Sequence, residues 1–197
     1  MLEPESIDGE TPIDTSEIRI KGIRTRRDLN RVEAENIFKA TTKYLASKPT
    51  KQLAPFDLAW CQRLHGEMFC DVWDWAGQIR TRNLNIGVTF GAIRENLALL
   101  LSDLHSWSGY GMEIVEQAAR LHFRAVHIHP FMNGNGRWSR MLANIWLSRN
   151  DHEIVNWPEA TFGTESVARK EYIAAIRKAV EHEFGPLLEL HRRYAKP

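Results

Sequence analysis

Apolar residues recur at helical spacing through most of the chain, and this pattern predicts an all-α protein with about seven helices. The first predicted helix covers residues 29–47, with Asp28 as its N-cap and Pro49 just beyond its end. Its expected apolar side consists of Val32, Ala34, Ile37, Phe38 and Leu45. The other predicted helices cover residues 55–69, 95–107, 113–127, 137–150, 167–182 and 187–194.

The spacing changes between residues 79 and 93, where two runs of residues stand at steps of two. The first run contains Ile79, Thr81 and Asn83, and the second contains Val88, Phe90 and Ala92. Residues 85–87 lie between the runs as a turn. Since a period of two is typical of a strand, this stretch predicts a small β-hairpin between helices. We call residues 79–93 the flap segment.

Composition indicates one globular domain with a short polar segment before it. The chain has 197 residues, of which 43% are apolar and 26% are charged. Residues 1–25 are expected to be a loosely ordered lead-in, and residues 26–197 the domain. The net charge of +1 predicts neither a nucleic-acid partner nor a membrane surface. No signal core is present and only two cysteines occur, so we expect a cytoplasmic protein.

The segment from His127 to Leu142 carries the clearest chemistry. Pro130 ends one helix, and Gly134 and Gly136 allow the backbone to approach a ligand closely before the next helix begins. A helix N-terminus binds anions, and guanidinium groups bind phosphate oxygens. The segment therefore predicts a polyphosphate site with His129 beside it as a general base. Its donors are expected from Gly134, Asn135, Gly136, Arg137 and Arg140.

The run from His129 to Arg140 resembles the motif HPFx(D/E)GNGRxxR of the Fic family, and matches its fixed letters outside the (D/E) position. Residues 64–87 and 169–190 also resemble the family, so the likeness covers about residues 30–190. Within the family the chain is most similar to the short bacterial branch called mobile mystery protein B. The resemblance implies a Fic-type helical domain with a hairpin flap.

The resemblance also implies a function, because Fic enzymes mostly transfer AMP from ATP to a Ser, Thr or Tyr hydroxyl of a target protein. By this analogy His129 takes the hydroxyl proton and Phe131 anchors the loop in the core. Residues 134–136 hold the α- and β-phosphates, and Arg137 and Arg140 hold the β- and γ-phosphates. The flap segment docks the target as an added strand. The flap residues expected to do so are Thr81, Asn83, Asn85 and Gly87.

One position departs from the motif, since Asn133 stands where the family places an acidic Mg²⁺ ligand. An amide oxygen brings no charge, so a weaker Mg²⁺ site is expected, with ATP supplying more of the ligands. Many Fic proteins also carry an inhibitory glutamate that pairs with the last arginine of the motif. Glu35 is the preferred candidate, and Glu165 is a second. A separate antitoxin with a helix-turn-helix is the alternative, because the resembled branch is associated with toxin–antitoxin pairs.

Other interpretations of the same residues remain open. His122, His127 and His129 cluster in sequence but lack zinc-ligand spacing. Cys61 lies in an apolar stripe, which favours a core residue over a nucleophile. The different-class alternative is a nucleotide-binding module with little catalysis, and a second enzymatic alternative is transfer of another phosphate-containing group.

Overall fold

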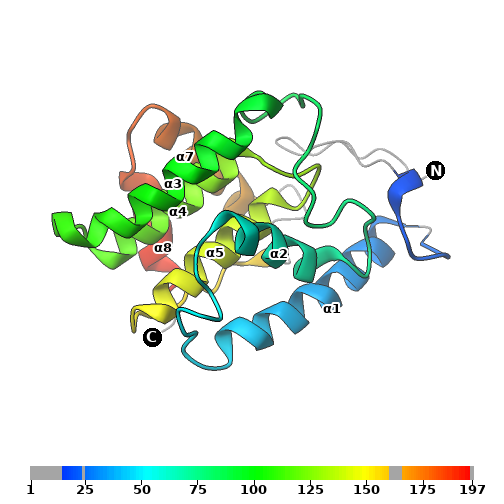
Figure 1. Ribbon diagram of the computed structural model, residues 1–197, viewed down its shortest axis with the longest axis horizontal. Helices are drawn as coiled ribbons and strands as arrows, with labels where there is room; N and C mark the ends of the chain where they lie inside the picture. Colours follow the sequence, from blue (N-terminus) through cyan, green and yellow to red (C-terminus); the bar gives the residue numbers. More distant parts are fainter. Residues whose placement is uncertain (1–14, 24, 160–165, 196–197) are drawn as a thin grey trace.

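The computed structural model describes residues 15–23, 25–159 and 166–195, and it is helical throughout, as the sequence predicts. Figure 1 shows the helices grouped around α5. The described α-helices are α1 (Arg26–Leu45), α2 (Leu58–Phe69), α3 (Ile93–Trp107), α4 (Ile114–Ile128), α5 (Asn135–Arg149), α7 (Val167–Val180) and α8 (Gly185–Arg193). Short 3-10 turns are η1 (Thr15–Glu17), η2 (Phe90–Ala92) and η3 (Ser108–Tyr110).

Helix α5 lies at the centre of the fold and contacts α1, α2 and α4 (Figure 1). Its core-facing side includes Trp138, Leu142 and Ile145, which are fully buried. Burial of such side chains is the main favourable contribution to folding. The packing of α5 therefore fixes where its N-terminus, the predicted phosphate site, lies in the molecule.

The first helix begins earlier than predicted and buries a different face. Its N-cap is Thr25, and Asp28 is the third helical residue, so the two form a capping box rather than Asp28 capping alone. Phe38, expected in the core, is 70% exposed. The buried stripe instead has a helical step of three or four residues and includes two polar ones. It consists of Leu29, Glu33, Asn36, Ala40 and Tyr44.

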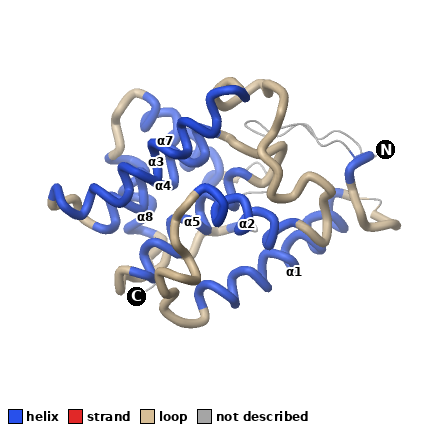
Figure 2. Tube along the Cα trace, viewed as in Figure 1, coloured by secondary structure: helices blue, strands red, loops and turns tan. Residues whose placement is uncertain are grey.

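The predicted β-hairpin is wrong, because the described chain has no strand in the flap segment (Figure 2). Its residues form a loop, then η2 and the first residue of α3. The loop donates backbone hydrogen bonds to the end of α4 instead of pairing with itself. The Arg80 N–H bonds to the Pro130 carbonyl at 2.9 Å, and the Val88 N–H bonds to the Ile128 carbonyl at 3.3 Å. The loop is therefore held beside His129.

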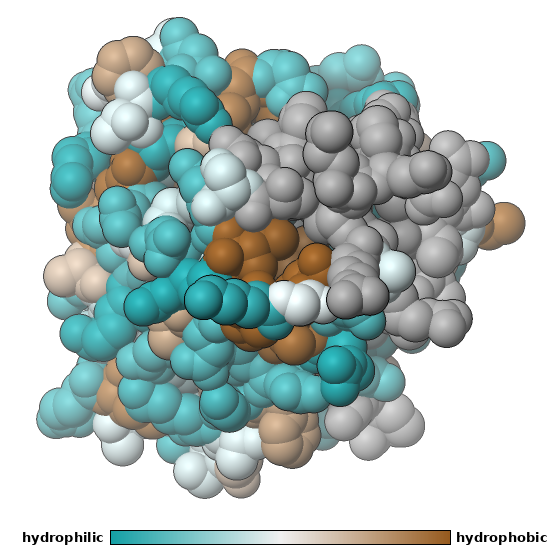
Figure 3. Space-filling view, turned by 90° about the vertical axis from the view of Figure 1, so that its right-hand side faces the viewer, coloured by the Kyte–Doolittle hydropathy of each residue, from teal (hydrophilic) through white to brown (hydrophobic). Residues whose placement is uncertain are grey.

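The described part of the lead-in lies along the end of α2. The Arg19 N–H donates to the Val72 carbonyl at 2.9 Å, and Ile18 pairs with Trp73 in an isolated bridge. Residues 1–14, where a loosely ordered lead-in is predicted, lie outside the described residues. Figure 3 shows the face at the right of Figure 1, which is mostly hydrophilic with an apolar area near its centre. Among the described residues, no helix is long and apolar enough to span a bilayer.

Candidate active site

His129 follows the last residue of α4 and turns the chain into the loop that precedes α5. Its backbone adopts a left-handed conformation, with φ 54° and ψ 60°. The helical conformation is disfavoured for a residue before proline, and Pro130 follows. A left-handed conformation costs energy in a residue with a Cβ, so surrounding contacts must hold it. We call residues 129–136 the motif loop.

The His129 imidazole is held in its neutral form. The residue is only 8% exposed, and burial together with the nearby Arg80 charge lowers the pKa of its side chain to about 4. A hydrogen bond with the Val126 backbone opposes this shift in part. A neutral imidazole can accept a proton, so His129 is available as a base at neutral pH.

The motif loop is braced by its own residues and by a histidine from α2. The Asn135 side chain accepts from the Phe131 N–H and donates to the Phe131 carbonyl, both at 2.9 Å. Phe131 is fully buried and stacks on His65 with ring centroids 3.7 Å apart, which confirms that it anchors the loop in the core. Asn135 therefore supports the loop with its side chain, and only its backbone N–H is left to face a phosphate.

His65 was not singled out for the site by the sequence, yet it connects α2 to the motif loop. The Gly77 N–H donates to its Nδ1 at 2.9 Å, so its Nε2 carries the hydrogen and donates to the Asn133 carbonyl at 3.1 Å. Burial lowers the pKa of His65 to about 3, which keeps this tautomer neutral. Its signal in the sequence is weak, since a histidine in an apolar stripe usually fills the core.

Asn133 and Gly134 form the turn into α5. The Asn133 side-chain oxygen accepts from the Gly134 N–H at 2.6 Å. Gly134 has φ +77° and lies against the Phe69 ring. The Trp138 N–H makes the first helical hydrogen bond, to the Gly134 carbonyl at 2.9 Å. The N–H groups of residues 135–137 come before this first bond and have no acceptor within the helix, as an anion site requires.

Arg137 is paired with a buried carboxylate of α1. Its guanidinium donates to Glu33 at 2.7 and 3.2 Å, and Glu33 is only 3% exposed. Trp73 donates its indole N–H to the same carboxylate at 2.8 Å. Burial lowers the pKa of Arg137, but the Glu33 charge and hydrogen bonds outweigh burial and raise it. Arg137 is therefore held by a two-pronged ion pair inside the fold.

Arg140 is paired in the same way with Glu159, from the segment after α5. Both hydrogen bonds are 2.6 Å long. The Arg140 side chain is 7% exposed and that of Glu159 is 48% exposed, so this pair reaches the surface. Arg140 also lies against the Tyr172 ring, 5.4 Å from its centroid. Burial lowers the pKa of Arg140, and Glu159 and Tyr172 together raise it further than burial lowers it.

Glu35, the predicted inhibitory residue, does not take part in the site. It is exposed on α1, whereas Glu33 two residues earlier lies on the buried stripe. Successive helical residues are rotated by about 100°, so positions two apart face nearly opposite sides. The carboxylates that hold the motif arginines are therefore Glu33 and Glu159. The second candidate, Glu165, lies outside the described residues.

The four flap residues predicted to dock a target are all exposed: Thr81, Asn83, Asn85 and Gly87. Leu84, Ile86 and Val88 between them are partly buried. Exposed and partly buried positions thus alternate from Asn83 to Val88, although no strand is formed. The alternation does not hold along the second predicted run, in which Val88 is partly buried and Phe90 is 48% exposed. The exposed edge lies beside His129, because a Cβ on Gly87 would stand 2.5 Å from the His129 Cβ.

The remaining histidines and Cys61 are placed apart from this chemistry. His127 is exposed. His122 is buried and bonds to His191 at 3.1 Å and to the Tyr172 hydroxyl at 3.0 Å. Cys61 is buried in the core, as predicted, and burial raises the pKa of its thiol. Among the described residues, these histidines and His129 therefore do not form a metal site.

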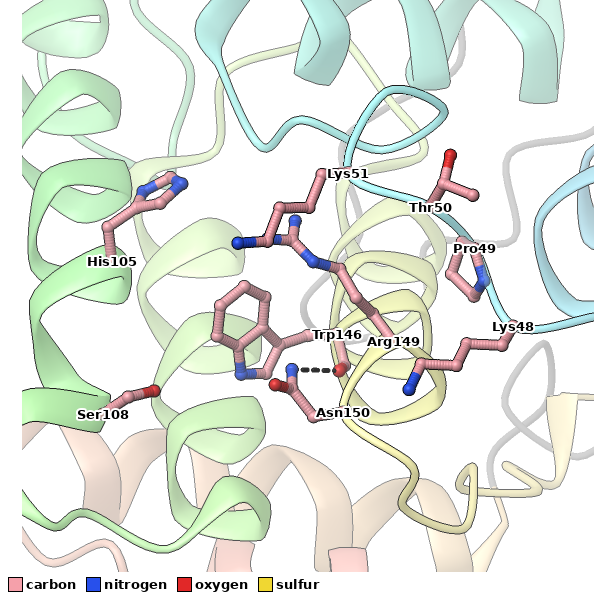
Figure 4. A pocket seen from close by; sticks show the side chains of 9 residues that line it. All are labelled: Lys48, Pro49, Thr50, Lys51, His105, Ser108, Trp146, Arg149 and Asn150. Carbon is pink, nitrogen blue, oxygen red and sulfur yellow. Dashed lines mark hydrogen bonds between the residues drawn. The ribbon is translucent and has the colours of Figure 1, made fainter.

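A cavity of about 450 Å³ lies near the C-terminal end of α5 (Figure 4). Arg149 and His105 extend into it from opposite sides. Arg149 is twelve residues beyond Arg137 on the same helix, or about 18 Å along its axis. None of its lining residues belongs to the motif loop, so this cavity is separate from the predicted phosphate site.

Comparison with known proteins identifies relatives of the central part of the chain. Residues 55–147 match the Fic/DOC family. The protein adenylyltransferase fic-1 of Caenorhabditis briggsae is 30% identical over 125 residues, which are 61% of this chain and 23% of that protein. The protein adenylyltransferase Fic of Drosophila ananassae is 31% identical over 116 residues, which are 57% of this chain and 22% of that protein. The match thus spans less than a quarter of these curated relatives.

Solved structures share the fold. The BepC protein of Bartonella tribocorum, a VirB-translocated effector with bound AMPPNP, superposes with a TM-score of 0.68 at 19% identity. The superposition covers 97% of this chain and 95% of that one. A fragment of Fic-1 from C. elegans superposes with a TM-score of 0.68 at 23% identity, over 89% of this chain and 50% of that one.

Proposed function

Because residues 55–147 form a domain of the Fic/DOC family, we propose that this chain is a protein adenylyltransferase. Its donor is ATP, and its acceptor is a Ser, Thr or Tyr hydroxyl of a target protein. The observation that carries the proposal is one juxtaposition. A neutral, buried His129 lies beside an exposed loop edge, and six residues later begins the helix that carries the two motif arginines.

Each part of this arrangement has a task in the transfer. The acceptor oxygen attacks the α-phosphorus, and His129 takes the hydroxyl proton. The bond from the α-phosphorus to the bridging oxygen breaks, and pyrophosphate leaves. The N–H groups at the start of α5, with Arg137 and Arg140, stabilise the charge on the phosphates. The flap segment holds the acceptor chain along its exposed residues.

Magnesium is expected with ATP, but the described residues do not form a protein-held site for it. Asn133 offers one neutral amide oxygen, and that oxygen already accepts from the Gly134 N–H. No group of three or more acidic, histidine or cysteine side chains in the described ranges could hold a metal ion. Magnesium prefers carboxylates and substrate phosphates. The phosphates of ATP would therefore supply most of the ligands of this ion.

The labelled phosphate of ATP tests the proposal directly. The purified chain is incubated with a cell lysate, Mg²⁺ and ATP labelled at either the α- or the γ-phosphate. Protein-bound label from the α-position alone is the result expected of AMP transfer. Label from the γ-position alone indicates a phosphotransferase. ATP binding without any label from either position indicates a nucleotide-binding module.

Glu159 is proposed to restrain the site in its resting state. Its carboxylate accepts from the two Arg140 nitrogens that a phosphate would need. The Glu159 side chain is 48% exposed, so it can move into solvent when a phosphate binds. Glu33 is more deeply buried and also accepts from Trp73, so it is the structural member of the two. Anionic phosphate and Glu159 therefore compete for one arginine.

Replacing Glu159 with Gln is expected to lower the Kd for ATP about tenfold, since the substitution removes the competing charge but keeps the side-chain size. Titration calorimetry with ATP measures this change. Glu153→Gln is the matched control, because Glu153 is exposed on the same connecting segment. Equal affinities of the Glu159 variant and the control would show that the ion pair does not restrain binding.

Three finer assignments stay predictions. Membership of the mobile mystery protein B branch and control by a helix-turn-helix antitoxin rest on the family resemblance. A cytoplasmic location rests on the low cysteine count and the lack of a signal core. The Arg140–Glu159 pair favours restraint within the chain over restraint by a separate protein. Co-purification of the chain with the product of its neighbouring gene would test the antitoxin assignment.

A further inference from the structure

Arg80 is a buried cation that the proposed chemistry does not use. It lies in the flap segment and is 3% exposed, and burial lowers its pKa. Across the described ranges, no carboxylate forms an ion pair with it. A buried charge is costly unless hydrogen bonds compensate it. The hydrogen-bond partners of Arg80 therefore indicate its role.

Within the part of the chain that the structure describes, the Arg80 guanidinium donates to backbone carbonyls alone. Its Nε donates to the His129 carbonyl at 2.8 Å, and one terminal nitrogen donates to the Arg82 carbonyl at 2.8 Å. The other terminal nitrogen donates to the Val88 carbonyl. The planar fork of arginine presents donors in several fixed directions, which a lysine cannot do. Arg80 thus ties both ends of the exposed loop to the backbone of the candidate base.

The backbone at this point requires such support. His129 has the left-handed conformation that a residue with a Cβ avoids, and the Arg80 N–H also bonds to the Pro130 carbonyl at 2.9 Å. Gly87 closes the arrangement from the other side. A Cβ there would stand 2.5 Å from the His129 Cβ and 3.0 Å from the Arg80 guanidinium. The loop, the arginine and the base are packed as one unit.

We propose that Arg80 is a positioning residue that fixes the backbone of His129 and couples it to the loop on which the target docks. The inference rests on the proposed function, since it assigns His129 the role of base. It gives the flap segment a second task besides docking, because a displacement of the loop displaces the base. The Arg80 guanidinium donates to backbone carbonyls, so the inference assigns it no contact with phosphate or acceptor.

The substitution Arg80→Lys tests the inference, because it keeps the charge and removes the fork. We expect kcat for AMP transfer to fall at least about tenfold, while the Kd for ATP stays within about twofold. Arg94→Lys is the matched control, since Arg94 is exposed at the start of α3. Wild-type kcat in Arg80→Lys overturns the inference.

Two further measurements keep the test decisive. The His129 ring signal in NMR reports the position of the base without any turnover, and we expect it to shift in Arg80→Lys but not in Arg94→Lys. If the wild-type chain transfers no AMP, the proposed function fails, and this signal still decides the inference. Gly87→Ala presses on His129 from the opposite side and is expected to shift the same signal. The shift in Gly87→Ala shows that the signal responds to displacement of His129, and an unchanged signal in Arg80→Lys overturns the inference.

Discussion

Replacing His129 with Ala is expected to reduce AMP transfer by about 10²–10⁴-fold and to leave ATP binding nearly unchanged. The expected size is that of losing a positioned general base. ATP binding should survive because the proposed phosphate contacts come from the N-terminal N–H groups of α5 and its two arginines, and not from His129. Initial rates with α-labelled ATP, compared with the Kd for ATP from calorimetry, separate the two effects.

The pH profile gives this prediction a second test. The lowered pKa of His129, about 4, means that the imidazole stays neutral as the pH falls from 7 toward 5. The acid limb of kcat/KM should therefore lie below pH 5, and not at about 6.5 where an ordinary histidine titrates. His127→Ala is the matched control, as His127 is exposed two residues earlier. Full AMP transfer by the His129 variant would show that His129 is not the general base.

Replacing Gly134 with Ala is expected to destabilise the fold by about 2–5 kcal/mol. Part of this is the left-handed backbone at φ +77°, which costs about 1–2 kcal/mol in a residue with a Cβ. The rest is overpacking of about 1–3 kcal/mol, because the new Cβ would lie 2.7 Å from two ring atoms of Phe69. For a chain of this length the melting temperature should fall by roughly 10 °C.

Gly111 offers a control that separates the two costs of this substitution. Its φ is +71°, but nothing lies within 4 Å of the position that a Cβ would take. Gly111→Ala should therefore show only the backbone cost, with a fall in melting temperature of about 2–8 °C. If both variants melt at the same temperature, Phe69 gives way and the turn into α5 is less constrained than its geometry indicates.

Periodicity and motif together predicted most of the helical framework. The apolar spacing placed the helices within a few residues of their observed bounds, as in α4 and α5. The motif loop was anticipated because proline and glycine have strong local effects on the backbone. His129 is accordingly the C-cap of α4, Gly134 is the N-cap of α5, and both arginines lie within the first two turns of α5.

The misplaced face of α1 has a physical cause. Periodicity assigns the core to apolar residues, but the buried stripe of α1 contains Glu33 and Asn36. Glu33 is tolerated there because Arg137, 104 residues later, neutralises it, and Trp73 adds a hydrogen bond. No residue near Glu33 in the sequence indicates that such a partner exists. Glu35 resembled the family pattern more closely and was preferred for that reason.

The hairpin was wrong for a related reason. Alternation reports that a segment has two faces, but it does not report which backbone the segment bonds to. In the flap segment the hydrogen bonds go to Ile128 and Pro130 instead of to a second strand. Arg80, which holds the loop in place, acts through backbone carbonyls that every sequence contains. Side-chain identity alone could not predict these contacts.

The contact between Trp73 and Glu33 makes Trp73 an intrinsic fluorescent probe of the ion pair between Arg137 and Glu33. The Trp73 indole donates to a carboxylate that also holds a phosphate-site arginine, and it stacks on Trp75 with centroids 5.0 Å apart. Indole emission responds to charges close to the ring. Nucleotide that draws Arg137 away from Glu33 therefore changes the emission of Trp73. Nucleotide that displaces only Glu159 acts next to Trp157 instead, whose carbonyl accepts from the Glu159 N–H at 2.8 Å.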